Sequence, residues 1–234
     1  MFKPIETLTL GLTYRSQADT DFDGDLDLDG PGIEALPGES KTSYDISMDD
    51  VDHPDQVQFG VRYQPHNRIS LEADVVWTNW GTVDEQTVEF DEQPANDVLG
   101  AILRENYPSG KIVQERDWED TRQIRVGVEW KATDILTLRG GYFYDPSPIP
   151  DDTFDITWPD ADKKTYSLGF GLNLGESWVV DGVFQYTMTE QDRQIGGEST
   201  NLNHTYAVSG NNGNVGVDAE GEIFGYGLTV SYKF

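Results

Sequence analysis

The sequence predicts an all-β protein, an antiparallel transmembrane β-barrel to which this chain contributes eight strands. Three observations support this prediction. Eight segments alternate apolar and polar residues with a period of two. Short turns and long polar loops follow one another in regular succession, and charged residues occupy only one of the two faces of these segments. Each segment has about ten residues, the length at which a tilted strand crosses a bilayer.

The period of two is clearest over residues 165–174. The even positions are large and apolar and the odd positions are small or polar: Tyr166, Leu168, Phe170, Leu172 and Leu174 alternate with Thr165, Ser167, Gly169, Gly171 and Asn173. Strict alternation places the two sets on opposite faces of a β-strand. The same pattern predicts strands at 8–14, 57–63, 69–77, 124–130, 136–144, 180–188 and 224–234.

The connections between these segments fall into two classes. Tight turns are predicted at 65–67, 131–134 and 175–177, and long polar loops at 16–55, 81–120, 145–164 and 189–222. Loops longer than about 12–15 residues are uncommon in compact soluble domains. With all four long loops at one end of the sheet and the short turns at the other, the layout is typical of a barrel in the bacterial outer membrane.

The distribution of charge indicates which face looks outward. The apolar face of all eight segments carries no charge, whereas the opposite face carries Arg15, Arg62, Glu72, Asp74, Arg125, Glu129, Arg139, Asp181 and Lys233. Apolar residues facing acyl chains and polar residues facing a lumen are what a membrane barrel requires. A soluble β-sandwich with an exposed polar face is the alternative, and a soluble lipocalin-like binder would need its large apolar residues turned inward.

Composition excludes several classes of function. The chain has 43 Asp and Glu against 16 Lys and Arg, a formal net charge of −27 that disfavours binding to nucleic acid. It has no cysteine, which excludes disulfides, cysteine zinc sites and thiol nucleophiles. His53, His66 and His204 show no metal-ligand spacing, so neither an enzyme nor a cofactor is expected. No apolar run approaches the roughly 18 residues of a transmembrane helix, and the N-terminus does not have the pattern of a signal peptide.

The C-terminal residues Tyr232, Lys233 and Phe234 resemble the signal by which bacterial outer-membrane barrels are recognised for assembly. We therefore expect the barrel-assembly machinery to be a partner through Phe234. Outer-membrane lipids and lipopolysaccharide are further expected partners.

Several short motifs point to one family. In chain order they are Trp118-Glu119-Asp120-Thr121, Thr137-Leu138-Arg139-Gly140-Gly141, Ser147-Pro148-Ile149-Pro150 and Trp158-Pro159-Asp160-Ala161-Asp162-Lys163. This succession resembles the C-terminal half of the FadL/TodX family of outer-membrane transporters. The resemblance implies passive uptake of long-chain fatty acids or other hydrophobic compounds. It also implies that residues 1–234 form a single transmembrane domain equivalent to the last eight strands of a fourteen-stranded barrel. The N-terminal hatch and the first strands of that barrel would lie outside this chain, unless its eight strands close alone.

Four arginines on the predicted lumen face are candidates for binding a fatty-acid carboxylate: Arg15, Arg62, Arg125 and Arg139. Arg139 is favoured because it lies in the family-like stretch. The alternative, which the near balance of charges favours, is that these arginines neutralise Glu72, Asp74, Glu129 and Asp181.

Residues 95–107 depart from the strand pattern and predict a short helix capped by Asn96 or Asp97. Its apolar stripe consists of Val98, Leu99, Ile102 and Leu103. Leu99, Ile102 and Leu103 are candidates for collecting a hydrophobic substrate at the extracellular mouth. Packing of the stripe against its own loop is the favoured alternative.

Asp21, Asp23 and Asp25 lie in two consecutive copies of Asp-x-Asp-x-Asp-Gly, at 19–24 and 25–30, a motif that opens an EF-hand loop. The glutamate expected at position 12 of that loop is absent, so an acidic, solvated strand extension is favoured over a weak Ca²⁺ site. Acidic loops that bind cations support an alternative function, that of a small structural or surface-interaction barrel.

Overall fold

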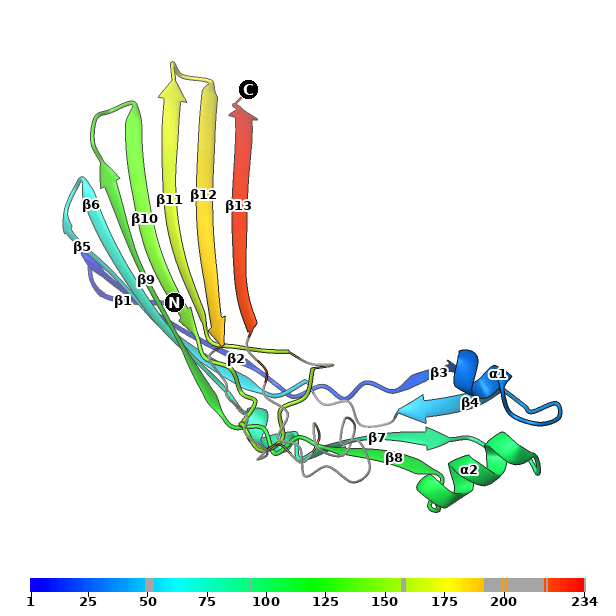
Figure 1. Cartoon of the computed structure of the whole chain (residues 1–234). Helices are drawn as coiled ribbons and strands as arrows, with labels where there is room; N and C mark the ends of the chain where they lie inside the picture. Colours follow the sequence, from blue (N-terminus) through cyan, green and yellow to red (C-terminus); the bar gives the residue numbers. More distant parts are fainter. Residues whose placement is uncertain are drawn as a thin grey trace. The chain divides into compact units, whose positions relative to one another are not determined.

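The computed structural model describes residues 1–48, 53–92, 94–156, 159–191, 199, 201, 217 and 219–233. The chain divides into two compact units (Figure 1). Unit 1 comprises Met1–Ser16, Asp55–Gly81 and Trp118–Phe234, and unit 2 comprises Gln17–Pro54 and Thr82–Asp117. That residues 1–234 form one membrane domain stays a prediction.

Unit 1 is an antiparallel sheet of nine strands. In spatial order these are β1 (Phe2–Ile5), β2 (Leu8–Arg15), β5 (Gln56–His66), β6 (Ile69–Thr78), β9 (Thr121–Lys131), β10 (Leu136–Asp145), β11 (Lys163–Leu174), β12 (Trp178–Gln191) and β13 (Ala219–Tyr232). The eight predicted strands are confirmed. The ninth, β1, was not predicted, because four residues that turn back onto β2 are too few to show a period of two.

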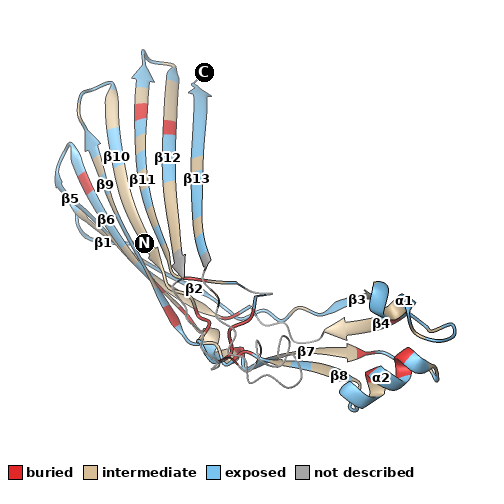
Figure 2. Cartoon of the chain, viewed as in Figure 1, coloured by how far each residue is buried: buried red, intermediate tan, exposed pale blue. Residues whose placement is uncertain are grey.

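The regular register of the longest strands keeps the two faces of this sheet separate. Strands β11 and β12 pair without a bulge from Lys163 opposite Thr189 to Leu174 opposite Trp178, so every side chain keeps its face. The apolar side chains are exposed, with Leu168 at 68%, Tyr226 at 90% and Leu228 at 70% of their full accessibility (Figure 2). An apolar patch of this extent is unusual on a soluble monomer and is required of a face in contact with lipid.

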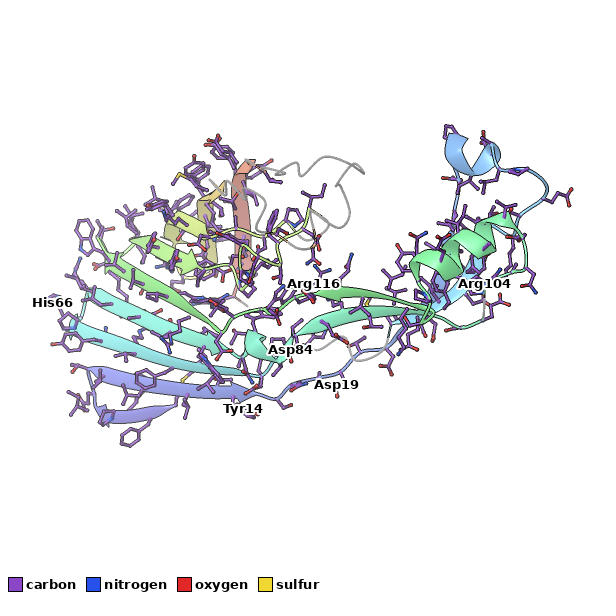
Figure 3. The ribbon with its side chains drawn as sticks, turned by 60° about the horizontal axis from the view of Figure 1, so that its bottom comes forward. Tyr14, Asp19, His66, Asp84, Arg104 and Arg116 are labelled. Carbon is purple, nitrogen blue, oxygen red and sulfur yellow. The ribbon has the colours of Figure 1, made fainter. Side chains whose placement is uncertain are left out.

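Several aromatic residues of unit 1 lie at strand ends, where amphipathic rings meet the headgroup region of a bilayer. Tyr14 is next to the last residue of β2, and His66 marks the turn at the opposite end of the β5–β6 hairpin (Figure 3). At that turn end Trp178 and Tyr232 pack together, with ring centroids 4.8 Å apart. Strands β1 and β13 are the two ends of the strand order, so the described strands form an open sheet.

Unit 2 corrects the expectation that residues 16–55 and 81–120 are only long polar loops. It contains a four-stranded antiparallel sheet in the order β3 (Phe22–Asp27), β4 (Ser43–Met48), β7 (Glu85–Phe90) and β8 (Lys111–Glu115). Two helices, α1 (Pro31–Glu34) and α2 (Val98–Asn106), accompany it, and a 3₁₀ turn spans Trp80–Thr82. No described helix is long and apolar enough to cross a membrane.

The predicted helix is present as α2, and it packs into the core of unit 2. Asp97 caps α2 by accepting a hydrogen bond from the Gly100 N–H at 2.7 Å, as expected. Leu99 and Leu103 are buried in one cluster with Tyr44 and Phe90, in the packing role that the sequence favoured. Ile102 instead lies at the surface, 40% exposed.

Acidification is expected to loosen the start of α2. The N–H groups of Gly100 and Lys41 donate to the Asp97 carboxylate and hold its pKa below the usual value. Because the folded-state pKa is the lower one, the stabilisation is present above the unfolded-state pKa of about 3.9 and is lost as the pH falls through the folded-state pKa. The hydrogen-exchange protection factors of the Gly100 and Lys41 amides should therefore fall in acid.

Asp97→Asn is the matched variant, since an asparagine can still cap the helix but does not titrate. Its protection factors at these two amides should change much less with pH. Equal pH dependence in the two proteins would contradict the role given to Asp97.

Candidate functional site

The polar face of the unit 1 sheet carries a three-strand ion-pair group centred on Arg139. Its Nε lies 2.9 Å from Glu129 Oε2 on β9, and its Nη1 lies 2.9 Å from Asp181 Oδ1 on β12. The second contact crosses β11 above Gly171, where a Cβ would lie only 2.8 Å from Asp181 Oδ1. Arg139, the favoured substrate residue, is therefore engaged by two carboxylates.

Arg62 is also paired. Its Nε lies 3.3 Å from Glu72 Oε1, and its guanidinium donates to Ser70 Oγ at 3.2 and 3.1 Å. The neutralising arrangement that the charge balance favoured is thus present at Arg62 and Arg139. Arg15, at the end of β2, is exposed and has no ion pair with any residue in the described ranges.

Arg125 has different neighbours from the other lumen arginines. Its guanidinium lies over the ring of Phe143 at 4.9 Å, and its Nη2 donates to Gln123 Oε1 at 3.0 Å. Asp74 is its partner in the β6–β9 register, but the Asp74 carboxylate leans over Gly60, where a Cβ would be 2.3 Å from Oδ1. Within the described part of the chain, Arg125 forms no ion pair with a carboxylate.

Unit 1 contains a pocket of about 410 Å³ where its strands pass into the long loops. Two tryptophans form one of its sides, with the rings of Trp80 and Trp118 packed edge to face at 5.2 Å. The remaining lining residues come from β9, β10, β11 and the loop that joins β10 to β11: Gln123, Asp145, Pro146, Pro148, Ile149, Pro159, Asp160 and Lys163. Lys163 forms an ion pair with Asp160. The tryptophans, the prolines and Ile149 make the lining mainly apolar, and the polar groups come from the four other residues.

Sequence reasoning did not identify this pocket, although its motifs build it. Asp162 accepts hydrogen bonds from the Tyr144 hydroxyl at 2.6 Å and the Ser147 N–H at 2.9 Å, which folds the Ser-Pro-x-Pro segment back onto β10. Asp120 accepts from the Trp77 indole N–H at 3.1 Å and from the Gly81 N–H at 3.0 Å. The available signal was that each of these acidic residues follows a tryptophan at short distance, Trp118 before Asp120 and Trp158 before Asp162.

The other predicted sites have less support from geometry. Asp23 and Asp25 lie on the same side of β3, and no group of three or more His, Cys, Asp or Glu in the described ranges is placed to hold a metal ion. In α2, Arg104 donates to the Ala95 carbonyl at 2.6 Å and ties the helix to the segment before it (Figure 3). Trp158 and Phe234 lie outside the described residues.

Comparison with known proteins agrees with this geometry. Residues 1–234 match the family described as outer membrane protein transport protein (OMPP1/FadL/TodX). A long-chain fatty acid transport protein of Escherichia coli O6:H1 is 22% identical over 231 residues, which cover 96% of this chain and 46% of that protein. The chain thus spans about half the length of this relative.

Two solved structures share the fold. A FadL homologue of Pseudomonas aeruginosa aligns with a TM-score of 0.69 at 21% identity, covering 99% of this chain and 50% of its own. A deltaS2S3 mutant of TodX, a monoaromatic hydrocarbon channel, aligns with a TM-score of 0.63 at 18% identity. The alignment covers 99% of this chain and 47% of the TodX chain.

Proposed function

Since the chain belongs to the outer membrane protein transport family OMPP1/FadL/TodX, we propose that it forms part of the wall of an outer-membrane channel for the passive uptake of hydrophobic compounds. The observation that carries this proposal is the two-faced sheet of unit 1. One face exposes large apolar side chains such as Leu168 and Leu228, and the other carries arginines, carboxylates and glycines. This is the division between lipid and lumen that a channel wall needs.

In the proposed pathway, the transported compound binds first in this pocket. An apolar compound buries its surface against Trp80, Trp118 and the prolines, and leaves water without any energy source beyond the hydrophobic effect. It then moves along the lumen face, where the charges of Arg62 and Arg139 are already neutralised. Further strands that pair with the edges at β1 and β13 complete the barrel in this proposal, in keeping with the greater length of the relatives.

Partners of the proposed channel follow from its location. We expect the apolar face to contact outer-membrane lipids and the loops to contact lipopolysaccharide. Phe234 is expected to present the assembly signal.

The proposal is tested by Trp80→Ala, which removes one of the two tryptophan rings that form one side of the pocket and lies outside the strands. We expect initial uptake of a hydrophobic compound by cells that express the variant to fall about tenfold, which corresponds to about 1.4 kcal/mol of lost binding. Trp130→Ala is the control, because Trp130 lies on the apolar face and is 49% exposed. Equal uptake by the Trp80 variant and the control, at equal amounts of folded protein in the membrane, would contradict the proposed pathway.

A further inference from the structure

We propose that the apolar face of unit 1 binds the phosphorylated sugar headgroup of an outer-leaflet lipid, the chemistry of lipopolysaccharide, through Arg122 and Lys164. This inference rests on the outer-membrane placement in the proposed function, but its ligand is a lipid of the membrane and not the transported compound. It assigns the contact with phosphate to the ends of two strands. A chain with a net charge of −27 repels phosphate unless cations are placed to receive it.

Basic side chains on the apolar face of unit 1 lie at the loop end of the sheet, where the strands meet the long loops. Among the described strands they are Arg122, the second residue of β9, and Lys164, the second residue of β11, and both are exposed. A cation is costly within the hydrocarbon of a bilayer and is stable at the level of the headgroups. The two positions therefore place positive charge where the phosphates of lipids lie.

Arg122 belongs to a group of residues from neighbouring strands. It is the cross-strand partner of Trp77 on β6, so the two Cβ atoms are about 5 Å apart. Trp77 Nε1 donates to Asp120 Oδ2 at 3.1 Å, and the Gly81 N–H donates to Asp120 Oδ1 at 3.0 Å. Asp120 is thus held by neutral donors, and Arg122 forms no ion pair with any residue in the described ranges.

Lys164 repeats this arrangement on β11. It is the cross-strand partner of Tyr144 on β10 and, on its other side, of the uncharged Met188. The Tyr144 hydroxyl donates to Asp162 Oδ2 at 2.6 Å, and the Ser147 N–H donates to Asp162 Oδ1 at 2.9 Å. Among the residues that the structure describes, Lys164 has no ion-pair partner. In both groups an aromatic side chain binds an acid, and the cation two residues later keeps its charge for a ligand.

The two groups together suit a ligand that carries both phosphate and hydroxyl groups. Only β10 separates β9 from β11, so the two cations lie about 10 Å apart across the sheet and one headgroup can reach both. Guanidinium and ammonium groups donate strong hydrogen bonds to phosphate. A carboxylate has about four acceptor sites, and the printed contacts of Asp120 and Asp162 use two each, which leaves acceptors for the hydroxyls of a sugar.

Glu222 on β13, another acid on this face, does not neutralise the cations. It lies two strands from Lys164 in the register and accepts a hydrogen bond from the Tyr186 hydroxyl. The competing explanation for Arg122 and Lys164 is that water at the membrane surface solvates both side chains and no particular lipid binds. Lipids with and without phosphate or sugar would then bind alike.

The test titrates the protein, purified in detergent and freed of lipid, with diphosphoryl lipid A, the acylated and phosphorylated sugar part of lipopolysaccharide, and follows binding by native mass spectrometry. For Arg122→Gln/Lys164→Gln we expect the affinity to fall at least about tenfold. Arg122→Lys/Lys164→Arg keeps both charges and should stay within about threefold of wild type. The matched control is Arg68→Gln/Lys131→Gln, which removes two positive charges at the turn end and should bind as wild type does.

Two further lipids test the chemistry of the headgroup. Wild-type protein should bind phosphatidic acid, which has phosphate without sugar, and dephosphorylated lipid A, which has sugar without phosphate, at least about fivefold more weakly than diphosphoryl lipid A. If either binds as tightly, the proposed headgroup is wrong. Full binding by Arg122→Gln/Lys164→Gln, or an equal loss in that variant and the turn-end control, overturns the site. Wild-type cells that take up no hydrophobic compound contradict the proposed function alone, because lipid binding is measured separately.

Discussion

Phe154→Ala is expected to destabilise the loop between β10 and β11 by about 3–5 kcal/mol, the cost of removing a fully buried phenylalanine side chain. Phe154 is 0% exposed and forms a buried cluster with Ile149, against which Trp118 and Val217 pack. Its carbonyl accepts a hydrogen bond from the buried Ser199 hydroxyl. Because Trp118 and Ile149 also line the pocket, loss of this cluster should open the pocket and weaken ligand binding.

The effect of Phe154→Ala should be local, since the strands of unit 1 are held by their own hydrogen bonds. Limited proteolysis should therefore cut the variant within 146–162 at a protease concentration that leaves the wild-type loop intact. Ile156→Ala is the matched control in the same loop, because Ile156 is 44% exposed. Equal cleavage of both variants would show that the buried cluster does not hold the loop.

Leu168→Arg is expected to cost about 2–4 kcal/mol of folding free energy, the penalty for a cation on the lipid face at the bilayer midplane. Leu168 lies in the middle of β11, on the apolar face, and is 68% exposed. In a soluble sheet the same exposed position would accept an arginine at little cost. Urea unfolding in lipid vesicles, followed by loss of the compact band on unheated gels, measures the difference.

Ser167→Arg is the control for this experiment, since it introduces the same side chain one residue earlier on the polar face. We expect it to be tolerated much better, because the lumen face already carries arginines. A loss of equal size in both variants would indicate a general packing defect in β11 and would contradict the assignment of the faces.

The sheet of unit 1 was largely predictable because its strands follow one physical rule. Each is long enough to show a period of two, and each has one apolar face whose charged residues, such as Arg122, Lys164 and Glu222, lie only near the loop ends of the strands. Strand β1 was not predicted because its four residues are too few to show the period. The prediction of long polar loops at 16–55 and 81–120 missed the sheet of unit 2, although the acidic strand extension favoured for the Asp-rich segment is present as β3.

The candidate site was less predictable, because it depends on which residues the fold brings together. The alternation correctly placed Arg62, Arg125 and Arg139 on one face, but it could not tell which carboxylate each would meet. That choice depends on glycines such as Gly171, which lets Arg139 reach Asp181 across β11, and Gly60, over which Asp74 leans. The pocket joins Trp80 to Trp118 and the prolines, residues far apart in the sequence.

The central claim is that the apolar face of unit 1 contacts lipid and the polar face lines an aqueous lumen. It is tested most directly by single cysteines at positions 165–168, which the absence of native cysteine makes simple. Each carries a spin label in lipid vesicles, and its accessibility to oxygen, which concentrates in the bilayer, is compared with its accessibility to a water-soluble nickel complex. The account predicts oxygen-accessible labels at 166 and 168 and nickel-accessible labels at 165 and 167. Nickel accessibility at all four positions, or the reverse alternation, would contradict it.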